Sequence, residues 1–173
     1  AVLAAARPWL VPAFALLAVT LLVYLPVLRG GFVWDDYGFV IGNPITEAGD
    51  GLRRFWLTRE AKDYFPLTSS TFWVEWRLWG SHAAGYHVVN VLLHAASAVV
   101  LWRILRRLRA PGAWLAGLLF AVHPVAVASV AYISERKNTL SGIFFLLSLL
   151  AYLRYDEDSR RRWYFLAIFS FLL

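Results

Sequence analysis

Long stretches without charged side chains alternate with short charged segments along this chain. A helix needs about 20 mostly apolar residues to cross the hydrocarbon core of a bilayer. Four uncharged stretches have or approach that length, and a further apolar run begins at Trp163 and continues to Leu173. The pattern therefore predicts five membrane spans, at about 8–28, 84–105, 112–132, 138–154 and 163–173, the last one truncated.

These spans predict an all-α fold, a polytopic bundle of transmembrane helices with a large first loop at about 29–83. The loop is too long for a simple connection, and two interfacial helices are predicted within it, at 51–57 and 66–79. The first span is interpreted as an anchor rather than a signal peptide, because no small-residue cleavage site follows it. The chain begins with Ala1 and stops inside a span, so we expect residues 1–173 to be the N-terminal part of a larger membrane domain.

The second predicted loop helix has an aromatic face. Phe72, Trp76 and Trp79 follow one another at helical spacing, and Glu75 is expected off that face. Tryptophan is enriched where a membrane meets water. Such a helix either anchors the loop in the headgroup layer or lines a groove for a lipid substrate, and the sequence favours neither.

Composition and charge sharpen the picture of a membrane protein. Hydrophobic residues make up 60% of the chain, and the absence of cysteine excludes disulfides and thiolate metal sites. The loops at 29–83 and 135–137 carry eight basic and eight acidic residues, so the net charge of +6 lies wholly on the other side of the membrane. Basic loops stay in the cytoplasm, which makes the long loop extracytoplasmic and removes the need for a nucleic-acid partner. The arginines of the basic side are Arg7, Arg103, Arg106, Arg107, Arg109, Arg154, Arg160, Arg161 and Arg162.

Two adjacent carboxylates, Asp35 and Asp36, follow the first span at the membrane surface. A carboxylate there can act as a general base or hold a divalent cation through its oxygen atoms. It can also lie solvated in a turn after Gly30 and Gly31, and the spacing alone favours this simpler interpretation.

Polar side chains also occur inside and between the later spans. His87, Asn90 and His94 share one helical face, and hydrogen bonding between helices explains them better than a metal site does. On the same side of the membrane as Asp35, the turn Glu135-Arg136-Lys137 follows His123. Its cations can grip a phosphate or lie at the interface beside Glu135, and the sequence does not separate these hypotheses.

Four segments in order resemble a known family. They are Phe32-Val33-Trp34-Asp35-Asp36, Tyr64-Phe65-Pro66-Leu67-Thr68, the run from Gly85 to His94, and His123-Pro124-Val125 followed by Ser134-Glu135-Arg136-Lys137-Asn138. Together they resemble bacterial tetratricopeptide-repeat membrane proteins related to the TMTC O-mannosyltransferases, within the GT-C glycosyltransferase superfamily. Members of the animal branch have arginine where this chain has Phe65.

The resemblance implies an enzyme of the bacterial inner membrane that moves a sugar from a polyprenyl-phosphate carrier to a protein or cell-envelope acceptor outside the cytoplasm. It implies that Asp35 or Asp36 is the base or a metal ligand, and that Arg136 and Lys137, with His123, hold the carrier phosphate. His87, Asn90, His94 and Glu135 would support that site. All of these residues should then meet at one cavity, and C-terminal tetratricopeptide repeats should follow. The alternative is a membrane scaffold without catalysis that anchors such repeats.

Overall fold

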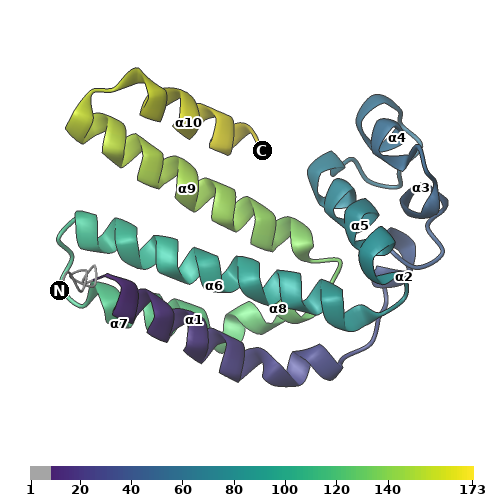
Figure 1. Cartoon of the computed structure of the whole chain (residues 1–173), viewed down its shortest axis with the longest axis horizontal. Coiled ribbons are helices and arrows are strands. Elements are labelled where there is room, and N and C mark those ends of the chain that lie inside the picture. Colours follow the sequence, from purple (N-terminus) through teal and green to yellow (C-terminus); the bar gives the residue numbers. More distant parts are fainter. Residues whose placement is uncertain (1–8) are drawn as a thin grey trace, which may run out of the picture.

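The computed structural model describes residues 9–173, and every regular element in that part of the chain is a helix (Figure 1). Arg7 and residue 8, where the first predicted span begins, lie outside the described residues. The five long helices of the bundle are α1 (Leu10–Tyr24), α6 (Ala83–Arg107), α7 (Ala113–Val122), α9 (Arg136–Asp158) and α10 (Arg161–Leu172).

Two segments are long and apolar enough to cross a membrane, Leu10–Arg29 and Ala83–Arg107. The first is α1 continued by the 3-10 helix η1 (Leu25–Arg29). A third candidate is bent by 47° between α7 and Pro124–Ala131, which contains η2 (Pro124–Ala126) and α8 (Val127–Ala131). The bend follows from Pro124, which holds His123 in an extended conformation and so ends α7. These findings confirm the all-α membrane bundle; α9 and α10 stay predicted spans.

Helix α6 is the centre of the bundle, because α1, α7 and α9 all pack against it (Figure 1). Small residues allow close packing, as is usual between helices in membranes. A Cβ atom on Gly117 of α7 would lie 3.0 Å from the Cβ atom of Trp102 on α6. Leu16 of α1 and Trp102 are both buried in this contact. Each of the three neighbouring helices therefore covers one face of α6. Together they fix the position of its first turns, which follow directly after the long loop.

Residues 30–82 form a compact lobe at one end of the bundle (Figure 1). Asn43 begins α3 by accepting hydrogen bonds from the backbone N–H groups of Ile45, at 2.9 Å, and Thr46, at 3.3 Å. This is a normal N-terminal cap, and the following proline suits the first turn of the helix. The helices of the lobe are α2 (Asp36–Phe39), α3 (Pro44–Glu47), α4 (Gly51–Leu57) and α5 (Pro66–Trp79).

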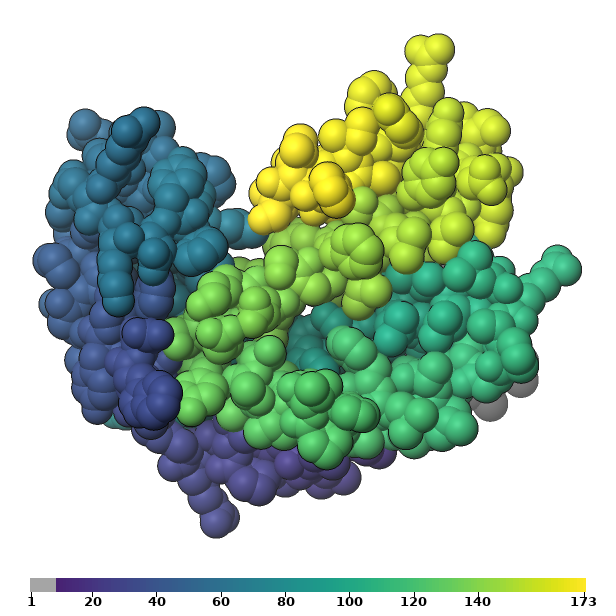
Figure 2. All heavy atoms as spheres, turned by 180° about the vertical axis from the view of Figure 1, so that it is seen from behind, coloured from purple at the N-terminus to yellow at the C-terminus, as the bar shows by residue number. Residues whose placement is uncertain are grey.

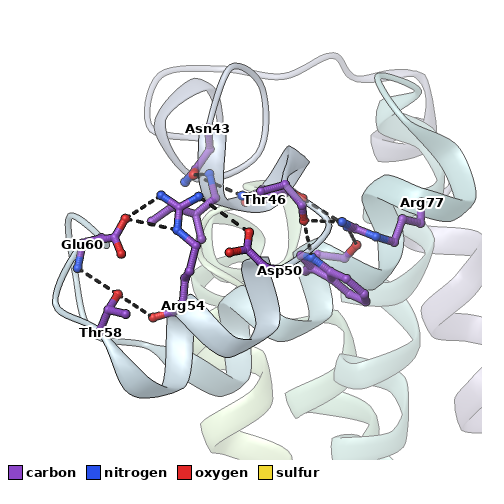
Figure 3. A network of polar contacts seen from close by, with 10 residues as sticks. Asn43, Thr46, Asp50, Arg54, Thr58, Glu60 and Arg77 are labelled. Carbon is purple, nitrogen blue, oxygen red and sulfur yellow. Dashed lines mark hydrogen bonds and ion pairs between the residues drawn. The ribbon is translucent and has the colours of Figure 1, made fainter.

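Polar contacts tie α5 to the short helices of the lobe (Figure 3). The Arg77 guanidinium donates to the carbonyl oxygens of Thr46 and Ala48 and stacks 3.4 Å from the centre of the Trp73 ring. The Trp73 indole N–H also donates to the Ala48 carbonyl, at 2.8 Å. These bonds satisfy carbonyl groups at the end of α3, so the lobe is a rigid support rather than a loose loop.

The aromatic face of α5 packs on the bundle. Phe72 is fully buried and contacts Tyr86 of α6, in a cluster that also contains Val40 and Ile133. The expectation that Glu75 lies off this face was wrong: Glu75 is one turn after Phe72, and only 4% of it is exposed. The reason is a buried cation on α9, described below.

Gly51 offers a test of the lobe packing. A Cβ atom there would lie 2.0 Å from the Ile45 carbonyl oxygen and 2.6 Å from the Trp73 ring, so backbone would have to move. We expect Gly51→Ala to lower the stability of the folded protein by about 1–3 kcal/mol, as overpacking does. Thermal unfolding in detergent measures this. Gly49→Ala is the matched control, because no atom lies within 4 Å of a Cβ atom at that position; equal midpoints for the two variants would contradict the packing.

Candidate active site

The acidic pair contacts the segment between α8 and α9 through Asp36. Its side chain is fully buried, and one carboxylate oxygen accepts the Val33 backbone N–H at 2.9 Å. The other oxygen accepts the Ser134 backbone N–H at 2.8 Å, across 98 residues of sequence. Because both oxygens are used inside the protein, Asp36 holds the two loops together.

Asp35 is placed differently although it is the next residue. The backbone N–H of Asp36 donates to the Val33 carbonyl at 3.0 Å, which closes a tight turn around Trp34 and Asp35. Trp34 has φ of 46°, a left-handed conformation that is unfavourable for a bulky residue. This turn leaves Asp35 exposed while Asp36 points inward. Asp35 is therefore the member of the pair that is free to meet a substrate.

A second neighbouring pair, Arg136 and Lys137, is divided in the same way. Arg136 is fully buried at the start of α9. Its guanidinium forms an ion pair with both oxygens of Glu75 and donates to the Asn90 side chain. It also donates to the Thr71 hydroxyl at 3.2 Å and the Tyr86 carbonyl at 2.9 Å. One buried arginine thus connects α5, α6 and α9.

Glu75 completes this cluster from the lobe side. Burial raises the pKa of its carboxyl group above the ordinary value of 4.5, because the loss of solvent outweighs the attraction of Arg136. The Arg136 side chain also lies over the Phe72 ring, 5.2 Å from its centre. The expected phosphate ligand Arg136 is therefore engaged with protein groups in this structure, and its donors point away from solvent.

Lys137 instead lines an open cavity of about 600 Å³ between the lobe, the first turns of α9 and the end of α10. Figure 2 shows this cleft between the blue lobe and the yellow α10. The Lys137 ammonium group bonds Glu135 at 3.1 Å and lies 5.9 Å from the centre of the Phe65 ring. The other lining residues are mostly aromatic or apolar: Trp56, Tyr64, Phe65, Pro66, Leu67, Thr68, Asn138, Leu140, Ser141, Leu172 and Leu173.

The predicted histidines lie at three separate places. His87 is buried next to Gly30, where an added Cβ atom would lie 3.1 Å from the His87 ring. His94 bonds the Ala121 carbonyl of α7 at 3.1 Å, which is a contact between helices. His123 is exposed at the bend of the third candidate span and accepts the Val125 N–H, and it does not line the cavity.

Asn90 belongs to the Arg136 cluster. Besides accepting from Arg136, its amide donates to the Tyr132 carbonyl at 2.8 Å, so it satisfies backbone in the second loop as well.

The acidic pair does not suit a divalent cation, which prefers six or more oxygen ligands. Both oxygens of Asp36 already accept N–H groups. Between residues 9 and 173, no group of three or more His, Asp or Glu side chains is arranged to hold a metal. Asp35 would be the one free carboxylate of such a site, so we derive no step through a metal ion.

The sequence analysis did not predict the partners of Arg136. Glu75 shares a helical face with Phe72 and is the only acid on α5, and that spacing was a usable signal. Nothing in the sequence identified the Tyr86 carbonyl or the left-handed Trp34. The structure brings Asp36 to Ser134 and thereby places the acidic turn beside the segment that leads to Lys137. The expectation that all the predicted site residues line one cavity was wrong, because Lys137 lines it and neither Asp35 nor Asp36 does.

Comparison with known proteins gives a consistent set of relatives. A family model described as dolichyl-phosphate-mannose-protein mannosyltransferase matches residues 66–172. A protein O-mannosyl-transferase of Caenorhabditis elegans is 34% identical over 157 residues, which cover 82% of this chain and 23% of the relative. TMTC4 of Homo sapiens, a protein O-mannosyl-transferase, is 34% identical, and the match covers 88% of this chain and 25% of the relative. TMTC2 of Mus musculus is 36% identical, and the match covers 84% of this chain and 19% of the relative. The chain thus spans a quarter or less of these relatives, and no solved structure matches it.

Proposed function

We propose, since this chain belongs to the dolichyl-phosphate-mannose-protein mannosyltransferase family, that the full-length protein transfers a sugar from a polyprenyl-phosphate carrier to a hydroxyl group of a protein or cell-envelope acceptor. Mannose is the first candidate for the sugar, because the relatives are named O-mannosyl-transferases. One observation carries the proposal. The hydrogen bond that Ser134 donates to Asp36 joins the turn that carries the exposed Asp35 carboxylate to the segment that leads to Lys137 and its cavity.

In this proposal Asp35 is the general base. It takes the proton of the acceptor hydroxyl while that oxygen forms a bond to the anomeric carbon of the sugar. The bond from that carbon to the carrier phosphate breaks, and the phosphate leaves with its lipid. Asp36 and the turn at Trp34 position Asp35 but do not touch the substrate. Two observations support this division of roles: the hydrogen bonds that Asp36 accepts from Val33 and Ser134, and the left-handed conformation of Trp34.

Lys137 is proposed to hold the carrier phosphate and to stabilise the charge that develops on it as the sugar leaves. An ammonium group has three donors, and Glu135 occupies one of them. The first turn of α9 lines the same cavity, and the N-terminus of a long helix favours an anion. The apolar walls, with α10 on one side, suit the first isoprene units of a carrier.

The lobe is proposed to lie on the extracytoplasmic side. Eight described arginines gather at the opposite end of the bundle, where α6 ends and α9 meets α10 (Figure 1). The positive-inside rule places such an end in the cytoplasm. The repeats that the resemblance implies would lie beyond residue 173.

The proposal is tested by Lys137→Met in the full-length protein, assayed with polyprenyl-phosphate mannose and an acceptor protein. We expect KM for the donor to rise about tenfold or more, the effect of losing one charged hydrogen bond. Lys62→Met is the matched control, because Lys62 is an exposed lysine of the lobe that does not line this cavity. Mass spectrometry of the acceptor measures transfer. Transfer that is absent from the wild-type protein would favour the scaffold, and equal KM values for the two variants would remove Lys137 from the site.

A further inference from the structure

A small polar cavity lies at the far end of the bundle from the lobe (Figure 1). Its volume is about 110 Å³, and it is lined by Arg103, Arg106 and Arg107 of α6 together with Trp9 and Leu150. The share of liquid volume of one water molecule is about 30 Å³, so the cavity can hold a phosphate group but not a nucleotide. Three arginines around one small polar space make it a place for an anion.

The positive charges around this cavity are only partly balanced by acids among the described residues. Arg154 of α9 lies near enough to act on Arg103, as do Arg106 and Arg107. The one ion pair found among these four arginines joins Arg107 to Glu157, at 3.2 Å. The other terminal nitrogen of Arg107 is buried and makes no hydrogen bond with residues 9–173. A buried donor without a partner is costly, and an anion in the cavity would satisfy it.

An apolar groove of about 440 Å³ adjoins the arginine cavity. Arg106 lines both, and its guanidinium lies over the Trp102 ring, 5.3 Å from the ring centre. The Trp114 indole N–H donates to the Pro12 carbonyl at 3.2 Å and fixes the far wall between α1 and α7. The remaining lining residues are Val11, Pro12, Ala15, Trp102 and Trp114. A ligand that fits both spaces has an anionic head and a hydrocarbon chain.

We propose that this paired site binds an anionic phospholipid, with the phosphate among Arg103, Arg106 and Arg107 and an acyl chain along the groove at Ala15. Basic pockets between membrane helices are known to take anionic headgroups. The site is on the opposite end of the bundle from Asp35 and Lys137, so it does not depend on the proposed transfer reaction. It would seat the ends of α1, α6 and α9 in one leaflet.

The test is a titration of the full-length protein in detergent with dioleoyl phosphatidylglycerol or dioleoyl phosphatidylcholine, followed by native mass spectrometry. We expect the anionic lipid to bind at least tenfold more tightly. Arg103→Gln with Arg106→Gln should remove this preference. The matched control is Arg160→Gln with Arg161→Gln, which removes the same charge from exposed positions at the same end and should keep it.

A second variant separates lipid binding from charge and from misfolding. Ala15→Phe fills the groove, keeps every arginine and should weaken binding of the anionic lipid at least threefold. Inorganic phosphate at millimolar concentration should not displace the lipid. Equal binding of the two lipids, an equal loss in the Arg160/Arg161 control, an unchanged affinity in Ala15→Phe, or displacement by phosphate alone would each overturn the proposal.

Discussion

Asp35→Asn should lower the rate of sugar transfer by about 10²- to 10⁴-fold in the full-length protein, the usual contribution of a general base. Asp35 is exposed and is not among the groups that hold the loops together, so the midpoint of thermal unfolding should stay unchanged. Transfer to the acceptor, followed by mass spectrometry, and unfolding in detergent measure the two effects separately.

Asp36→Asn is the matched comparison, since it makes the same chemical change one residue later. An amide offers one acceptor where the Asp36 carboxylate accepts both the Val33 and the Ser134 N–H groups. We expect a loss of about 1–3 kcal/mol of stability. The roles of the two residues would be reversed if Asp36→Asn kept the wild-type unfolding midpoint but abolished sugar transfer, while Asp35→Asn kept the wild-type rate of transfer.

Glu75→Leu should cost about 3–5 kcal/mol of stability, because it leaves the Arg136 charge buried without its partner. Arg136→Leu should cost less, since the Glu75 carboxyl can become neutral by taking up a proton whereas a guanidinium cannot lose one. Combining the two changes should recover much of the stability lost in Glu75→Leu. Thermal unfolding of the three variants in detergent measures these differences, and a double variant less stable than Glu75→Leu would contradict the account.

The pH dependence of Arg136→Leu follows from the raised pKa of Glu75. Without the guanidinium, burial alone acts on the carboxyl group and raises its folded-state pKa further. A raised folded pKa stabilises the protein fully below the ordinary value of 4.5 and loses that stabilisation as pH rises through the folded value. Arg136→Leu should therefore regain stability on acidification relative to Glu75→Leu, which has no such group; parallel pH profiles would argue against it.

The bundle was readable from the sequence because bilayer length and charge position are strong local constraints. The first two candidate spans, α1 with η1 and α6, lie close to their predicted bounds. The bend after α7 was less accessible, although Pro124 is its cause, because proline is compatible with both a bent span and a loop end. The lobe was predicted only as two helices, since its short helices depend on caps and on Arg77 contacts from another element.

The sequence predicted which segments contribute to the candidate site, but not which residue of each segment is exposed and which is buried. Asp35 and Asp36 are chemically identical in sequence, and only the backbone turn at Trp34 decides which one is exposed. Arg136 and Lys137 are equally interchangeable until tertiary contacts are known, because burial of Arg136 depends on Glu75 and Asn90 from two other helices. Such partners lie 46 to 61 residues away and have no local signal.

The link between Asp36 and Ser134 also constrains how the protein is made. A ribosome synthesises the lobe before residue 134 exists, so the Asp36 carboxylate lacks its second hydrogen-bond donor, the Ser134 backbone N–H, while α6 and α7 enter the membrane. The cluster around Arg136 is delayed for the same reason. A nascent chain that ends before residue 134 can therefore hold the lobe against α6 through Phe72 and Tyr86, but it lacks the links through Asp36 and Arg136.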